Sequence, residues 1–271
     1  MGSDRTGFSG HAARSFAAAL LLACPAAMAA GRPSLAITDV SIVDVEHGGL
    51  VGPRTVLIAD GRIVSIDAPS DAAIPRNAER IDGHGRFLMP GLVDMHVHLF
   101  NNASHRPSNT WSFPMYVANG VTGVREMAAV ADDIATVKQW RRAIDDGSLV
   151  APRILAAGIV AWGPSPEEAA HQVDVAADAG ADFIKVFTEL PEPAWRAVLE
   201  AAKRRSLKIM GHVPGGVSAV AAAEAGERSE EHLMQVFEAC SPLEQGLLDA
   251  RRGLAGRALV ARRDADEPRV P

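Results

Sequence analysis

Hydrophobic and polar residues alternate with a period of two in the chain that follows residue 34. Such alternation is typical of half-buried β-strands, and an Asp-Gly pair between two strands is a strong signal for a tight hairpin. The strand-like segments are 35–37, 40–45, 55–58 and 62–66, with turns at Gly48-Gly49 and Asp60-Gly61. The pattern therefore predicts a small β domain over residues 31–88.

Further along the chain, short apolar runs alternate with segments of helical periodicity. Ser165-Pro166-Glu167-Glu168 is a capping box with proline at the first helical position, which marks the start of one helix. We expect strands at 92–98, 120–127, 153–162, 181–187, 207–213 and 229–233, separated by helices at 111–119, 132–144, 166–180, 192–205 and 217–225, and a last helix near 242–252. This order predicts parallel βαβ units over residues 89–250, in either a barrel or an open doubly wound sheet.

The strand that opens the second region carries two histidines one residue apart. His96 and His98 follow Pro90-Gly91 and lie in an apolar run. Alternate residues of a strand point to the same side, so the two imidazoles and Asp94 share one face and can hold a metal ion. The alternative is a pair of ordinary strand histidines that pack at a domain edge.

Residue types that bind metals recur at the ends of later strands. Lys185 ends the fourth predicted strand, His212 the fifth and His232 the sixth, each about one βα unit after the last. In a (β/α)8 barrel the carboxyl ends of the strands meet at one mouth. The recurrence favours the barrel and predicts that these side chains converge with His96 and His98.

Lys185 is the most informative of these residues. In its strand it shares a face with Phe183 and Phe187, while Ile184 and Val186 occupy the other face. A buried ammonium without a partner costs several kcal/mol. We therefore expect Lys185 to be neutral or modified; the alternative is a lysine whose amine reaches solvent at the strand end.

Three other polar residues lie beside this predicted mouth. Arg125 and Glu126 end the second strand, where we expect them to face the mouth and contact a substrate or each other. Glu231 is adjacent to His232. If both lie on a strand, Glu231 points to the opposite face, away from the chemistry.

The run PGLVDMHVHL, residues 90–99, closely resembles the first barrel strand of the metal-dependent amidohydrolase superfamily, in particular its imidazolonepropionase-like and Xaa-Pro dipeptidase-like branch. The resemblance implies a (β/α)8-barrel hydrolase preceded by a small β-sandwich. It implies hydrolysis of amide or related C–N bonds, cyclic or dipeptide-like, by a hydroxide held between two divalent ions, with Zn²⁺ as the default. In this reading His96 and His98 bind one ion, His212 and His232 bind the other, and a carbamate on Lys185 bridges them.

One expected part of the family pattern is missing. The family uses an aspartate at the end of the eighth strand as a metal ligand and proton shuttle, and the tail 251–271 shows no strand pattern to carry it. Neither Asp264 nor Asp266 is assigned that role. The interpretation is an α/β chain with an incomplete, C-terminally truncated barrel of about six strands, whose open edges predict oligomerisation or poor solubility. Two functions remain: an amidohydrolase, or a catalytically inactive exported metal-binding fragment.

Composition narrows the partners and suggests a location. With 271 residues, 48% hydrophobic content and a net charge of −6, the chain can build a large core and favours a small-molecule substrate over nucleic acid. Its two cysteines build neither a disulfide framework nor a Cys-based zinc site. Residues 1–30 predict a signal peptide, whose apolar run 16–23 is too short to span a membrane. Export to the periplasm or outside follows, either after cleavage near 27–30 or as a lipoprotein anchored at Cys24.

Overall fold

The computed structural model describes residues 35–100 and 109–252. The chain forms two compact units, Met1–Met89 and Pro90–Pro271, and each is described by itself. The predicted signal peptide with its candidate lipid anchor, and the tail after residue 252, lie outside the described residues. Among the described residues, no helix combines the length and the apolar character that a membrane span requires.

The first unit contains one five-stranded sheet. Its strands are β1 (Leu35–Val43), β2 (Leu50–Ala59), β3 (Arg62–Asp67), β4 (Glu79–Asp82) and β5 (Phe87–Leu88). The order is β3-β2-β1-β4, with β5 also paired to β1; β4 and β5 run parallel to β1 and the other pairs are antiparallel. Asp60 and Gly61 have φ angles of 50° and 71°, so the predicted hairpin turn between β2 and β3 is confirmed.

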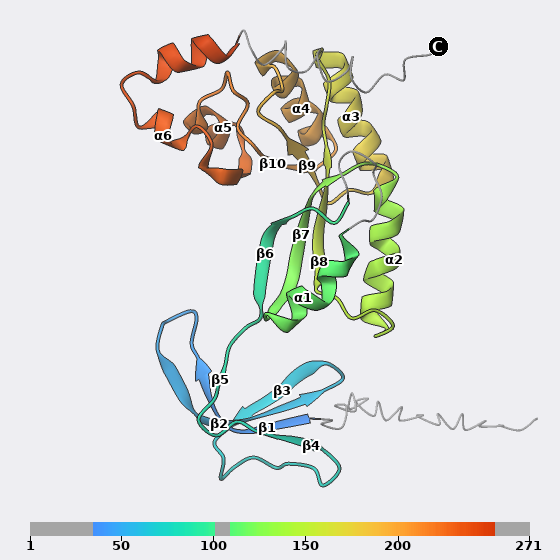
Figure 1. The fold of residues 1–271 in the computed structure, drawn as a ribbon, viewed down its shortest axis with the longest axis vertical. Helices are drawn as coiled ribbons and strands as arrows, with labels where there is room; N and C mark the ends of the chain where they lie inside the picture. The colour runs from blue at the N-terminus through green and yellow to red at the C-terminus, as the bar shows by residue number, and fades with distance from the viewer. Residues whose placement is uncertain (1–34, 101–108, 253–271) are drawn as a thin grey trace, which may run out of the picture. The chain divides into compact units, whose positions relative to one another are not determined.

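The second unit is built on six parallel strands. They are β6 (Leu92–Val97), β7 (Val121–Ala129), β8 (Arg153–Val160), β9 (Phe183–Val186), β10 (Lys208–Gly211) and β11 (Glu227–Glu230). The sheet order β11-β10-β9-β8-β7-β6 follows the chain, and every neighbouring pair is parallel. The predicted α/β fold is confirmed, because this curled sheet forms a half-barrel (Figure 1).

Helices connect the strands and cover one face of the sheet. They are η1 (Thr110–Ser112), α1 (Phe113–Ala118), α2 (Asp133–Asp145), α3 (Pro166–Ala179), α4 (Glu192–Arg204), α5 (Ala219–Ala225), η2 (Glu231–Leu233) and α6 (Val236–Ala239), with residues 244–252 also helical. The capping box is confirmed: the Ser165 side chain accepts a hydrogen bond from the backbone N–H of Glu168. Gly180 ends α3 in the left-handed conformation that favours glycine.

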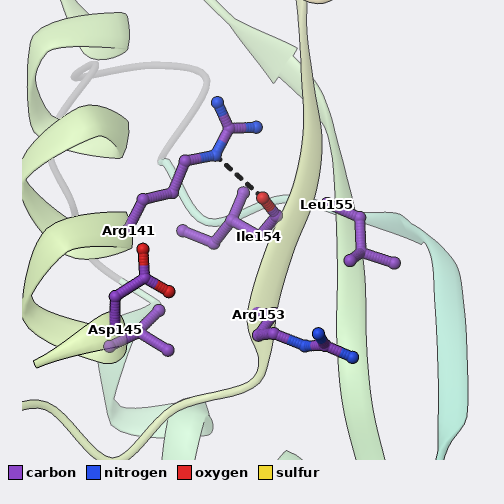
Figure 2. Close-up of a pocket in the computed structure, with 6 residues that line it drawn as sticks. Arg141, Asp145, Arg153, Ile154 and Leu155 are labelled. Atoms are coloured by element: carbon purple, nitrogen blue, oxygen red, sulfur yellow. Dashed lines mark hydrogen bonds between the residues drawn. The ribbon is translucent and has the colours of Figure 1, made fainter. Parts of the chain in front are cut away.

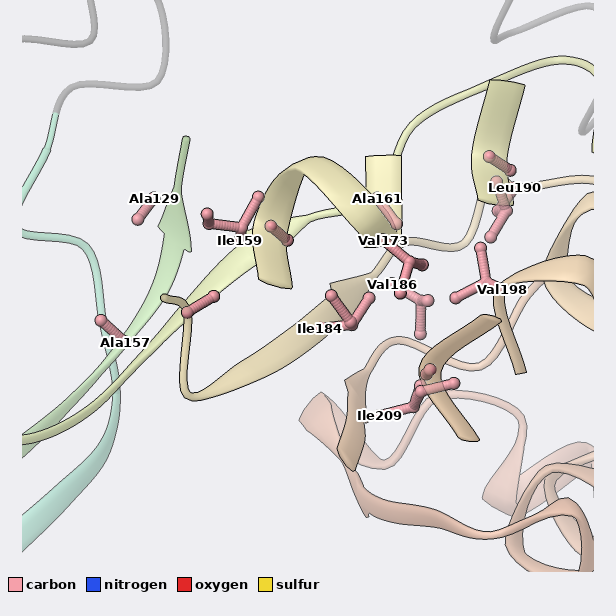
Figure 3. Packing of buried hydrophobic residues seen from close by; sticks show 14 of the residues in the cluster. Ala129, Ala157, Ile159, Ala161, Val173, Ile184, Val186, Leu190, Val198 and Ile209 are labelled. Carbon is pink, nitrogen blue, oxygen red and sulfur yellow. The ribbon is translucent and has the colours of Figure 1, made fainter. Parts of the chain in front are cut away.

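The core of the second unit lies between the sheet and its helices (Figure 3). Ile184 and Val186 of β9 are fully buried in the same apolar cluster as Val173 of α3 and Val198 of α4. Successive side chains of a strand point to opposite faces. Lys185, which lies between those two residues, therefore points to the inner face of the half-barrel, as the sequence pattern predicts.

The end of β11 differs from the prediction. The strand stops at Glu230, and His232 lies in the short helix η2 with a φ of 62°. His212 likewise follows the last residue of β10 by one position. The strands are shorter than predicted because the chain turns at the mouth of the half-barrel, and the turning segments carry the candidate ligands.

Candidate metal centre and active site

Four histidine rings gather at the carboxyl ends of the parallel strands. The ring centroids of His96 and His98 are 5.2 Å apart, and those of His96 and His232 are 4.6 Å apart. His212 lies 5.1 Å from His232 and 6.5 Å from His96. The predicted convergence of these four imidazoles is therefore observed, although they come from segments up to 136 residues apart.

Backbone contacts hold the segment that carries the first two histidines. His98 directly follows β6, and its carbonyl oxygen accepts a hydrogen bond of 2.6 Å from Asn109 Nδ2. The next residue, Leu99, donates its backbone N–H to the carboxylate of Glu126. The carbonyl oxygen and the N–H of the peptide bond between His98 and Leu99 are thus both hydrogen-bonded to side chains. These two bonds fix the path of the chain after β6.

Lys185 is completely buried on the inner face of β9. Its Nζ lies 4.9 Å from the centroid of the Phe187 ring and has no hydrogen-bond partner among the described residues. Burial lowers the pKa of this amine to about 8. The predicted burial is confirmed, and the alternative of an amine that reaches solvent is wrong.

The position of Glu231 overturns a prediction. Glu231 is buried, and its Oε2 accepts a hydrogen bond of 2.7 Å from Nδ1 of His96. Its Oε1 accepts from Arg125 Nη2 at 2.6 Å and from Ser229 Oγ at 2.5 Å. The rule of alternating faces fails here because Glu231 and His232 lie in a helical turn and not on a strand, so both reach the histidine cluster.

Arg125 and Glu126 are both buried, but on opposite faces of β7. The guanidinium of Arg125 reaches the cluster through Glu231, and its Nε donates to the carbonyl oxygen of Met95 at 2.5 Å. The carboxylate of Glu126 instead accepts backbone N–H groups, and burial raises its pKa to about 7. The two side chains thus have separate partners, and the expectation that both face the mouth is wrong.

Two aromatic rings lie beside the cluster. Trp162 follows β8 and stacks on Phe187 with a centroid distance of 5.1 Å. Phe187 in turn meets the ring of His212 edge-on at 4.8 Å. Both aromatic side chains are half-buried, so they form an apolar wall beside the histidine cluster.

A separate shallow pocket lies at the other end of the sheet, between α2 and the start of β8 (Figure 2). Its most prominent charged group, Arg141, donates from Nε to the Ile154 carbonyl at 2.8 Å and from Nη2 to Asp182 at 2.7 Å. This guanidinium is already engaged within the protein. The lining of the pocket includes none of the five candidate ligands, so it is distinct from the histidine cluster, and Arg141 is not free to bind a ligand there.

Comparison with known proteins decides the family. The model of the amidohydrolase family matches residues 87–255, which is more than half of the chain. The chain belongs to the amidohydrolase family. The match covers the half-barrel with every candidate ligand, so the predicted family is confirmed.

Among amidohydrolase relatives, an imidazolonepropionase from Cupriavidus necator is 32% identical over 186 residues, which are 61% of this chain and 40% of that protein. A dihydroorotase from Anaeromyxobacter dehalogenans is 31% identical over 127 residues, or 46% of this chain and 29% of that protein. The crystal structure of a putative prolidase from Bifidobacterium longum matches with a TM-score of 0.53 and 26% identity, covering 66% of this chain and 49% of that one. The chain thus spans less than half the length of these curated relatives.

The donor groups of the cluster suit a divalent metal centre of the kind that amidohydrolases use. Burial lowers the pKa of His96, His98 and His212, the last to about 4, so these rings are neutral near pH 7 and can ligate. The positive charge of Lys185 contributes to the lowering of all three pKa values. His98 Nδ1 and Lys185 Nζ are buried polar atoms without hydrogen-bond partners among the described residues.

The side chains are nevertheless not in a closed ligand sphere. Within residues 35–100 and 109–252, no three His, Cys, Asp or Glu side chains are arranged to hold a metal ion as they stand. The five predicted ligands are gathered, and their role as ligands stays a prediction.

Proposed function

We propose that this chain acts as a metal-dependent hydrolase of amide bonds, with its reactive centre at the histidine cluster. The observation that supports this most is the convergence of His96, His98, His212 and His232 at the strand ends around a buried lysine. Burial lowers the pKa of His96, His98 and His212, so these three rings are neutral near pH 7. Each ring has polar nitrogens that need partners, and a bound ion would satisfy them.

The proposed ligand set is the four histidines and Lys185, with Zn²⁺ as the default metal. When bound, such ions acidify a water molecule and polarise the scissile carbonyl. The family uses two of them, and Lys185 would serve both after it reacts with carbon dioxide. In that reaction the neutral amine forms an N–C bond and releases a proton, which gives an anionic carbamate.

Lys185 is well suited to this reaction. With a pKa lowered to about 8, a substantial fraction of the amine is neutral at mildly alkaline pH, whereas an exposed lysine is almost fully protonated. Burial also protects the product from water. Carbamate formation would also explain why a buried amine without a hydrogen-bond partner among the described residues is present at this position.

The proposed substrate is a small amide, cyclic or dipeptide-like. The names of the relatives support this class, since they are an imidazolonepropionase, a dihydroorotase and a putative prolidase. Trp162 and Phe187 would pack against an apolar part of that substrate, because their stacked rings form the wall next to His212.

The test uses the full 271-residue chain, stripped of metal and then loaded with Zn²⁺ in the presence and absence of bicarbonate. We expect about two ions per chain and hydrolysis of members of a panel of Xaa-Pro dipeptides and cyclic amides. Lys185→Ala should abolish turnover, whereas Lys208→Ala, at an exposed position of β10, should not. Bound metal without hydrolysis of any amide would support the alternative of an inactive metal-binding chain, and the absence of both would overturn the metal centre.

A further inference from the structure

The hydrogen bond between His96 and Glu231 joins the two outermost strands of the half-barrel. His96 lies on β6, at one edge of the sheet, and Glu231 follows β11 at the other edge. The two residues are 135 positions apart in the chain, and their bond of 2.7 Å is partly buried. This contact therefore fixes the distance between the carboxyl ends of β6 and β11, and it orients the ring of His96.

Glu231 is itself held by its neighbours. Arg125 and Ser229 both donate to its Oε1, so that Oε2 remains for His96. Arg125 also donates from Nε to the carbonyl oxygen of Met95, the residue before His96. The guanidinium of Arg125 therefore donates hydrogen bonds both to the carboxylate of Glu231 and to the backbone next to His96.

This arrangement selects one form of the imidazole. An ionised carboxylate only accepts hydrogen bonds, so Nδ1 of His96 must carry the proton. In the neutral ring the lone pair is then on Nε2. His98 provides a contrast within the same cluster, because its Nδ1 has no hydrogen-bond partner among the described residues and its tautomer is not selected in this way.

We propose that Glu231 is a positioning residue, which presents Nε2 of His96 to the metal and is held for that task by Arg125. The proposal rests on the proposed function, because it takes His96 to be a ligand. Carboxylates that orient a ligating histidine typically change metal affinity by about 10- to 100-fold when they are removed.

The variant that tests this is Glu231→Gln, which keeps the shape of the side chain and removes its charge. The matched control is Glu230→Gln, one residue earlier at the end of β11 and only partly buried. The first measurement is the nitrogen-15 chemical shift of the histidine rings in the metal-free full chain, with His96 assigned by its loss in His96→Asn. We expect a pure Nδ1–H form of His96 in the wild type and in the control, and a mixture of tautomers in Glu231→Gln.

The second measurement is the affinity for Co²⁺, followed by its visible absorption. Glu231→Gln should weaken Co²⁺ binding about 10- to 100-fold, and the control should leave it unchanged. Unaltered ring shifts and unaltered affinity in a folded Glu231→Gln chain would overturn the proposal. If that variant does not fold, Ser229→Ala, which removes one donor to the carboxylate, should give a smaller loss in the same direction, and no loss would count against the role of Glu231.

The two proposals fail in different ways. A wild-type chain that binds no Co²⁺ refutes the metal centre, and the ring shifts then still decide whether Glu231 orients His96. A wild-type chain that binds Co²⁺ with the same affinity as Glu231→Gln supports the metal centre and refutes the positioning role.

Discussion

Replacing the buried Lys185 with methionine should stabilise the metal-free protein. The amine has an exposed fraction of zero and a pKa that burial lowers from 10.5 to about 8. At 1.36 kcal/mol for each pH unit, this difference corresponds to a cost of about 3 kcal/mol for keeping the charged amine in the folded state. Methionine has a similar length and no charge, so Lys185→Met removes that cost.

The stability difference between Lys185→Met and the wild type should decrease as the pH rises. Below pH 8 the amine is charged in both the folded and the unfolded states, so the folded wild type bears the full cost. Between pH 8 and 10.5 the folded state loses its proton first, and the wild type gains stability as the pH rises. The advantage of Lys185→Met should therefore be about 3 kcal/mol at pH 7 and should disappear as the pH approaches 10.5.

The assay is urea unfolding, followed by circular dichroism at several pH values between 7 and 10. Chelator and buffers free of carbon dioxide keep the amine unligated and unmodified. Lys208→Met is the control, because Lys208 is exposed on the neighbouring strand β10 and should show little change. A Lys185→Met chain that is less stable than the wild type at pH 7, or whose advantage does not vary with pH, would refute the reasoning.

Three further predictions concern stability and substrate binding. Burial raises the pKa of Glu227 from 4.5 to about 7. As the pH rises through this range, the free energy of unfolding of the wild type should therefore fall by about 3 kcal/mol relative to that of Glu227→Gln, and urea unfolding at pH 4.5, 6 and 7.5 measures this difference. Gly211→Ala would drive a Cβ into the carbonyl oxygen of Val186 and should cost at least about 2 kcal/mol, whereas Gly226→Ala, with open space around the new Cβ, should cost about 1 kcal/mol from its left-handed backbone alone; equal losses would contradict this. Trp162→Ala should raise KM for amide substrates more than it lowers kcat, and the opposite split in steady-state kinetics would show that the aromatic wall does not hold the substrate.

Local sequence patterns were sufficient for most of the fold. The Asp60-Gly61 hairpin and the capped start of α3 depend on residues that are neighbours in the chain, so the sequence predicts them correctly. The burial of Lys185 also follows from local pattern, because the alternation of a strand places it opposite Ile184 and Val186. Strand ends were less accurate, since the turns at the mouth depend on contacts with other strands.

The partners of the polar residues were decided by tertiary structure. Nothing in the sequence around Glu231 predicts that it bonds to His96, because the two lie at opposite edges of the sheet and meet only when the sheet curls. The same applies to Arg125, whose partners come from β6 and from the segment after β11.

The amino-acid sequence by itself determined the order of the strands and helices, the family and the set of candidate ligands, because each of these depends on residue types and their spacing along the chain. Only the tertiary structure decided which groups meet, since a helical turn after β11 replaced the expected strand and rotated Glu231 into the cluster. A difference of one residue in where a strand ends reverses the side to which the next side chain points. That is why the gathering of the candidate ligands could be predicted from the sequence, whereas the network of hydrogen bonds around them could not.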